Sequence, residues 1–229
     1  MRKNAIVILV LVALGLVARA EEKVLKETGS ARARFAWEKW DGRFADEIPS
    51  LTRVIEGSGT GAIEVDSGSS AVWVSFDPDK TSARAVLEKL KGAGRYDAAK
   101  LTSVVACFDA PFVTVRARAA FHGAKPPQKG ELSVTVESGE GHTILLAESK
   151  KRTGKWQAGI TTKAPAEVVL DKSSKTEPGG RVQSYTHHFT AKKGAEDSTI
   201  ALTINVVDKN KDGKETLHTI ELSVPVLGN

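Results

Sequence analysis

Cysteine is almost absent from this chain. Cys107 is the only thiol among 229 residues. A single thiol cannot form an intramolecular disulfide, so the fold must be stabilised by packing. Two roles stay open for Cys107: a buried, inert thiol, or an intermolecular disulfide partner in an exported chain.

Long hydrophobic runs are also lacking, apart from one at the N-terminus. Ala5–Val17 is an uninterrupted apolar run that follows a short basic segment, and it is too short to span a bilayer. The small-x-small sequence at residues 18–20 predicts a secretory signal peptide over residues 1–20, cleaved between Ala20 and Glu21. We therefore expect an exported protein, periplasmic or secreted, with no stable membrane anchor after cleavage.

The chain has no strong excess of either charge once this segment is removed. The signal peptide carries three basic residues and no acidic ones, which leaves 30 Lys and Arg against 28 Asp and Glu. A protein that binds nucleic acid needs a concentrated positive field, and neither half of the chain has one. No nucleic-acid partner is predicted.

Recognisable catalytic and metal-binding motifs are missing as well. The run from Asp208 to Gly213 resembles the first half of a calcium loop, but Thr219 stands where such a loop needs a bidentate carboxylate. A hairpin turn is the simpler interpretation. His187 and His188 are neighbours on a predicted strand, so they should face opposite sides and cannot chelate together. The chain is predicted to be non-enzymatic, with no cofactor and no metal ligand set.

The most organised stretch runs from residue 61 to residue 98. Apolar and polar side chains alternate over residues 61–66 and again over residues 71–77, which predicts two strands joined by a hairpin. The apolar residues that follow have helical spacing and form one stripe: Ala83, Val86, Leu87 and Leu90. Together they predict strand, hairpin, strand, helix.

The flanking segments extend this pattern on both sides. Alternation near residues 33–37 predicts a first strand, and residues 101–106 predict a last one. Between them, an apolar stripe predicts a helix that begins near Ile48, with Pro49 in its first turn. The expected fold is therefore an α+β ferredoxin-like (βαββαβ) domain over residues 30–107.

The sequence VWVSFDPDKTSARAVLEKLKGAGRYDA resembles the second half of a heavy-metal-associated (HMA) domain. That family ends with a V-x-V-x-F-D-P strand, a helix and a G-Y-x-A motif, here Gly94–Ala98 with one inserted residue. The resemblance implies a functional loop between the first strand and the first helix. The residues at this position are Trp40, Asp41, Gly42 and Arg43.

This loop departs from the family pattern. The family carries a C-x-x-C pair there for a soft metal such as Cu(I), and the loop here has no cysteine, histidine or methionine. The metal chemistry therefore does not carry over, and the loop remains a candidate interaction surface. Trp40 is either an exposed recognition anchor or part of the core.

The second half of the chain, residues 110–229, has a different pattern. Short alternating strands separated by turn clusters predict an all-β immunoglobulin-like sandwich. The half also resembles, faintly, the exported N-terminal domain of thiol:disulfide interchange proteins, although the cysteine pair of that family is missing. We predict that the two halves are separable near Cys107–Pro111; the alternative is one coupled unit, in which the strand at residues 101–107 continues into the sandwich.

The function that fits these observations is an exported, non-catalytic binding or adaptor protein with a protein partner. One alternative is extracytoplasmic metal handling through scattered His and Asp side chains. Another is an accessory role in thiol/disulfide redox chemistry.

Overall fold

The computed structural model describes residues 25–38, 40, 44–57, 59–66, 69–123, 125–146, 159–177 and 180–228. The predicted signal peptide, its cleavage point at Ala20 and Glu21, and the loop residues Asp41, Gly42 and Arg43 lie outside these ranges. The elements within them are β1 (Leu25–Thr28), β2 (Ser30–Ala36), α1 (Phe44–Ile55), β3 (Thr60–Val65), β4 (Ala71–Phe76), α2 (Ala83–Gly92), β5 (Lys100–Ala110), β6 (Val113–His122), β7 (Gln128–Ser138), β8 (Thr143–Leu145), β9 (Gly159–Lys163), β10 (Val168–Glu177), β11 (Val182–Ala191), the short 3-10 helix η1 (Ala195–Asp197), β12 (Thr199–Lys209) and β13 (Glu215–Gly228).

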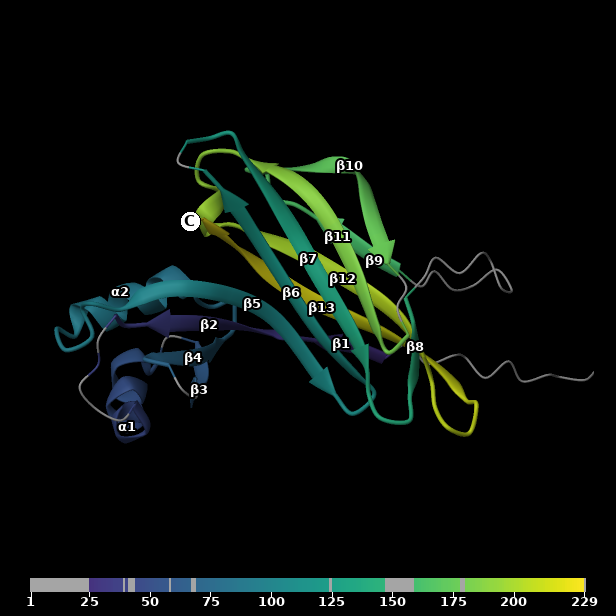
Figure 1. Ribbon diagram of the computed structural model, residues 1–229, viewed down its shortest axis with the longest axis horizontal. Helices are drawn as coiled ribbons and strands as arrows, with labels where there is room; N and C mark the ends of the chain where they lie inside the picture. Colours follow the sequence, from purple (N-terminus) through teal and green to yellow (C-terminus); the bar gives the residue numbers. More distant parts are fainter. Residues whose placement is uncertain are drawn as a thin grey trace, which may run out of the picture.

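All strands of the described residues are linked by hydrogen bonds. One path runs β10-β11-β7-β6-β5-β2-β4-β3, and a second group contains β1, β13 and β12, with β8 and β9 both paired to β12. The two groups join where the end of β13 pairs in parallel with β6. In Figure 1 the strands β12 and β13 cross behind β6 and β7, so this part of the molecule has two layers of strands.

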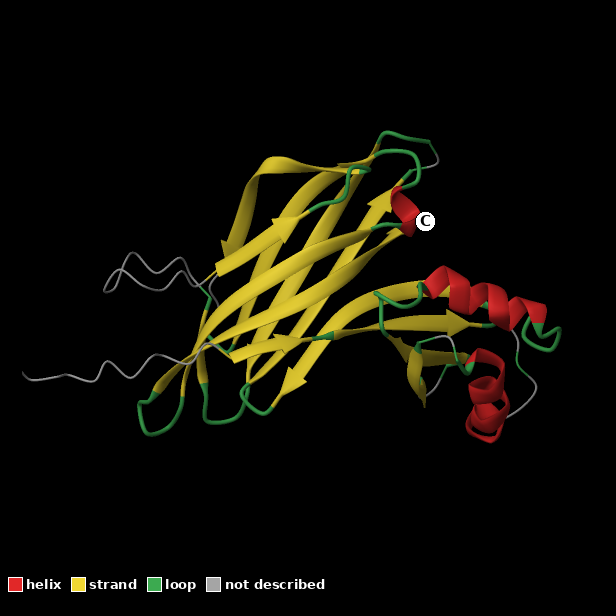
Figure 2. Ribbon diagram, turned by 180° about the vertical axis from the view of Figure 1, so that it is seen from behind, coloured by secondary structure: helices red, strands yellow, loops and turns green. Residues whose placement is uncertain are grey.

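The two helices lie together in the part of the molecule built from β2 to β5 (Figure 2). Helix α2 begins where Ser82 accepts a hydrogen bond from the backbone N–H of Ala85 at 3.1 Å, an N-cap that satisfies an otherwise unpaired donor. Its apolar stripe packs inward, as its spacing predicts. Helix α1 begins at Phe44 rather than near Ile48, so Pro49 lies inside the helix and not in its first turn.

The predicted fold class is wrong. We expected an α+β ferredoxin-like domain over residues 30–107 followed by a separate immunoglobulin-like sandwich. The described chain is instead mostly β, with two short helices, and its strands form one connected sheet. The reason is β5, which does not end at residue 107 but continues to Ala110 and pairs with β6. The immunoglobulin-like assignment is not confirmed either.

Strand β5 contributes to both hydrophobic clusters of the molecule. Val104 packs in the cluster formed with β2, β4 and the helices. Ala106 and Phe108 belong to the cluster between the two strand layers. The expected boundary between residues 107 and 110 therefore falls inside one continuous strand. Whether the halves fold separately stays a prediction.

The chain passes from one strand group to the other at Gly29. Strand β1 pairs in parallel with β13, while β2 pairs with β5 and β4. Only Gly29 lies between β1 and β2, and its N–H donates to the carbonyl oxygen of Glu221 at 2.9 Å. A Cβ atom at Gly29 would lie 2.5 Å from the carbonyl oxygen of Cys107, so only glycine fits here.

The burial of α2 predicts which substitutions destabilise it. Leu90 is 1% exposed, whereas Leu87 is only partly buried at the edge of the same cluster. We expect Leu90→Ala to lower the free energy of unfolding by about 2–5 kcal/mol, because the cavity lies deep in the core. Leu87→Ala should cost less, and the exposed control Glu88→Ala should change stability by less than about 0.5 kcal/mol. Equal shifts of the three denaturation midpoints would contradict this assignment of the helix face.

Candidate functional site: a groove on the outer face of β6, β7 and β11

The candidate site is a hollow of about 330 Å³ on the outer face of three adjacent strands. Strand β7 lies between β6 and β11, and both pairings are antiparallel. The side chains and backbone that line the hollow come from Arg118, Ala120, His122, Lys129, Gly130, Glu131, Ser133 and His188. We call it the β6–β7–β11 groove.

Strand register sets the lining side chains in rows. Opposite residues of neighbouring strands lie about 4.5–5.5 Å apart. One row contains Ala120, Glu131 and His188, because Glu131 pairs with both others. The next row contains Arg118 and Ser133, and Ser133 is followed on β11 by Thr186. The groove is therefore built on regular backbone, which holds its side chains in fixed relative positions.

The centre of the hollow carries little side chain on the outer face, because Ala120 contributes only one methyl group. Gly130 lines the hollow with its backbone alone, since its position in β7 faces the core. A Cβ at Gly130 would lie 2.4 Å from the ring of Phe189 and 2.8 Å from the carbonyl oxygen of Ala120. Phe189 is completely buried below this point. The packing of Phe189 against the backbone of β7 thus requires glycine at this position.

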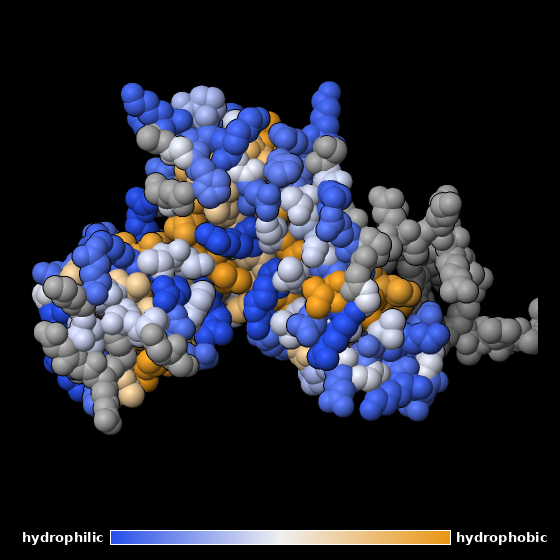
Figure 3. Space-filling view, in the orientation of Figure 1, coloured by the Kyte–Doolittle hydropathy of each residue, from blue (hydrophilic) through white to orange (hydrophobic). Residues whose placement is uncertain are grey.

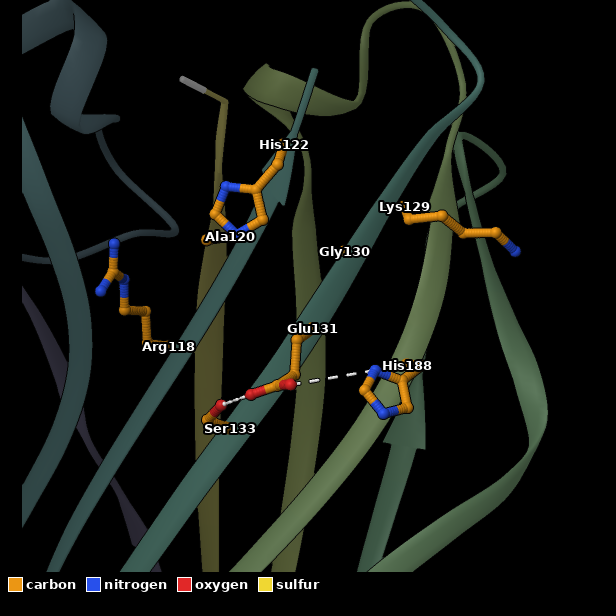
Figure 4. Close-up of a pocket in the computed structure, with 8 residues that line it drawn as sticks. All are labelled: Arg118, Ala120, His122, Lys129, Gly130, Glu131, Ser133 and His188. Atoms are coloured by element: carbon orange, nitrogen blue, oxygen red, sulfur yellow. Dashed lines mark hydrogen bonds and ion pairs between the residues drawn. The ribbon is translucent and has the colours of Figure 1, made fainter.

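The lining of the groove has two basic side chains, Arg118 and Lys129, and one acidic side chain, Glu131. Glu131 accepts a hydrogen bond from the hydroxyl of Ser133. The Nδ1 atom of His188 lies 3.9 Å from the other carboxylate oxygen of Glu131 (Figure 4). Lys129 extends away from the centre, and its Nζ donates to Thr190 at 3.2 Å. Arg118 is exposed and has no ion pair with any residue of the described ranges.

Trp40, the one described residue of the predicted interaction loop, packs into an aromatic cluster. Its ring stacks on Tyr96 with centroids 5.8 Å apart and lies 5.6 Å from Trp37. The guanidinium of Arg95 covers the Trp40 ring at 5.8 Å. These contacts favour the core interpretation of Trp40. With Asp41, Gly42 and Arg43 outside the described ranges, the loop stays a prediction as an interaction surface.

This cluster also has a polar anchor. Glu47 of helix α1 accepts a hydrogen bond from the Tyr96 hydroxyl at 3.1 Å and forms an ion pair with Arg95. Burial, followed by the nearby Glu47 carboxylate, raises the pKa of the Tyr96 phenol above its ordinary value. Tyr96 therefore keeps its proton and ties the turn after α2 to α1.

The other residues that the sequence analysis singled out lie in the core, in a turn or on a regular strand. Cys107 is buried, with its Sγ 3.5 Å from the hydroxyl of Ser30. The Asp208–Gly213 run contains a hairpin turn, in which Asn210 accepts from the backbone N–H of Lys214 at 2.9 Å. His187 is buried and His188 is exposed, so the two face opposite sides, as predicted.

Two histidine–carboxylate pairs join loops and edge strands. His142 lies 2.8 Å from Asp208 of β12, and His218 of β13 lies 2.9 Å from Glu27 of β1. The ring of His218 also stacks on Phe112 at 3.9 Å. In the described ranges, no three His, Cys, Asp or Glu side chains gather closely enough to hold a metal ion. The pairs fasten the turn before β8 to β12, and β1 to β13.

A second, smaller hollow lies between the helical part and the strand layers. It measures about 40 Å³ and is lined by residues of β4, β5, β13 and the start of α2. Figure 3 shows a mostly hydrophilic surface, with hydrophobic colour in the recess between the two parts of the molecule and in a second patch on the strand part. A volume of this size holds one or two water molecules, so it is a packing gap rather than a ligand site.

Comparison with protein-family models and with curated proteins finds no match to this chain. The resemblance to the HMA family therefore stays a prediction. No helix of the described ranges is both long enough and apolar enough to cross a membrane.

The groove could not be found from the sequence pattern. Alternation places Arg118, Glu131 and His188 on outward positions of their strands. However, the three positions are far apart in sequence, and only the order of the strands brings them together. Strand order depends on contacts between distant segments, which periodicity does not report.

Proposed function

We propose that this protein is an exported, non-catalytic binding or adaptor protein that holds its ligand or partner in the β6–β7–β11 groove. The observation that carries the proposal is the groove itself. It is an open hollow on regular strands, lined by a guanidinium, a carboxylate, a hydroxyl and imidazoles. Such a lining offers hydrogen bonds to a polar surface without enclosing it, which suits recognition.

Rigidity supports the same proposal. Every lining residue belongs to β6, β7 or β11, and β7 is paired along its length on both sides. The groove is therefore largely preformed, and binding would require little ordering of the protein. Export is inferred from the N-terminal sequence.

The groove can be tested by filling it. We expect Ala120→Trp to abolish ligand binding, because an indole would occupy the centre of the hollow. The matched control is Thr135→Trp, which adds the same group to an exposed position of β7 that does not line the groove. Thermal unfolding would be followed while peptides, oligosaccharides and small polar metabolites are added. A ligand at about 100 times its Kd should stabilise the protein by about 2.7 kcal/mol.

The outcomes separate clearly. A ligand that stabilises the unmodified protein and Thr135→Trp, but not Ala120→Trp, supports binding in the groove. A ligand that stabilises all three proteins equally binds elsewhere and contradicts the assignment. Conversion of a bound compound to a product would contradict the non-catalytic part of the proposal.

A further inference from the structure

We infer that the β6–β7–β11 groove binds a molecule carrying an oxyanion, a carboxylate or phosphate group, with Arg118 as its anchor. The inference rests on the proposed function and names the chemistry of the ligand. Its starting observation is the exposed guanidinium of Arg118, which has no ion pair among the described residues. Arginine recognises carboxylate and phosphate oxygens through paired N–H donors.

The neighbouring arginine shows the contrast. Arg116, two residues earlier on the same face of β6, forms an ion pair with Asp109 at 2.7 Å. Two arginines of strand β2 are also paired: Arg34 forms an ion pair with Asp66, and Arg32 forms one with Glu64. Arg118 has only the hydroxyl-bearing Ser133 opposite it in the register. Its charge is therefore available to a ligand at the β6 edge of the hollow, on the side away from Glu131 (Figure 4).

Hydroxyl groups continue the row beyond Arg118. Ser133 and Thr186 follow it on β7 and β11, so the row spans about 10 Å from end to end. An oxyanion at Arg118 would leave the rest of a polar molecule lying over these two hydroxyls. The row thus fits a charged end group attached to a body that forms hydrogen bonds.

The negative charge of Glu131 should repel an anionic ligand, so its removal gives a second test of the inference. Its carboxylate stands in the adjacent row, next to Ser133 and His188. The imidazoles of His188 and His122 also face this side of the sheet, together with Lys129. Replacement of Glu131 by glutamine keeps the size of the side chain and removes its negative charge. An anionic ligand should then bind more tightly, because like-charge repulsion is lost.

The experiment uses the full mature chain and two probes, tripolyphosphate and citrate, followed by amide chemical shifts in an NMR titration. Arg118→Gln should weaken binding of the favoured probe by about tenfold or more, because a charge-assisted hydrogen bond is lost. Glu131→Gln should strengthen it by about two- to fivefold. Arg53→Gln, at an exposed arginine of helix α1, is the matched control and should leave the affinity unchanged.

Each outcome decides the matter. Saturable shifts at groove residues with one probe only would assign the oxyanion as phosphate or as carboxylate. No saturation by either probe up to about 10 mM, or equal affinity of Arg118→Gln and the unmodified protein, would overturn the inference. If a neutral ligand binds in the groove and is blocked by Ala120→Trp but not by Arg118→Gln, the proposed function stands and the oxyanion inference is wrong.

Discussion

Gly29→Ala is expected to lower the free energy of unfolding by about 3 kcal/mol or more. The added methyl group would lie 2.1 Å from Cδ2 of Leu222 and 2.5 Å from the backbone carbonyl oxygen of Cys107. The leucine could turn aside, but the carbonyl belongs to β5 and is held in the sheet. Either β1 separates from β13, or β5 shifts. Denaturation midpoints measured in urea would show the loss.

Gly92→Ala is the matched control for this substitution. Gly92 is the last residue of helix α2, and a Cβ there would meet no atom within 4 Å. Alanine favours the helix more than glycine does, so the variant should be neutral or more stable by up to about 1 kcal/mol. If Gly29→Ala were as stable as Gly92→Ala, the bend between β1 and β2 would be far more adaptable than its contacts indicate.

A chain divided between Phe108 and Asp109 is expected to give two unequal fragments. The fragment 21–108 keeps β2, β3, β4, both helices and the hydrophobic cluster between them, so it should still melt cooperatively. The fragment 109–229 loses Ala106 and Phe108 from its cluster, as well as β1, which pairs with β13. It would expose β6 and β13 as unpaired edges, and we expect it to aggregate.

Calorimetry and light scattering on the two fragments would test this expectation. Cys107 adds a chemical readout, because it is buried in the intact protein. It should react with a thiol reagent much faster in fragment 21–108 than in the whole chain. Cooperative melting of both fragments, with no change in thiol reactivity, would instead show two independent modules.

Local features of the fold could be predicted from the sequence, and long-range ones could not. The stripe of Ala83, Val86 and Leu90 identifies helix α2, because helical spacing relates residues only three or four positions apart in the sequence. Alternation identifies β3 and β4 for the same reason. The start of α1 was misplaced because proline inside a helix is disfavoured and normally marks its first turn.

The predicted fold class was wrong because the pairing of β5 with β6 was not foreseen. Alternation marks β5 as a strand but does not show that it hydrogen-bonds to β2 over one part and to β6 over the next. A strand shared in this way turns two expected domains into one connected sheet. The groove was not predicted for the same reason: Glu131 lies next to His188 only because β7 pairs with β11, and the sequence pattern does not show which strands pair.

The hydrogen-bonded contact of Glu27 with His218 has a consequence for how the chain reaches its native state. The two residues are 191 positions apart, and they join the first described strand to the last. Pairings this distant in sequence slow folding, because a long loop must close before the contact stabilises anything. During synthesis β1 would remain without its partner until β13 had been made. The finished fold is thus sensitive to the integrity of the C-terminal strand, since a chain that stops before it leaves both β1 and β12 without the neighbour they share.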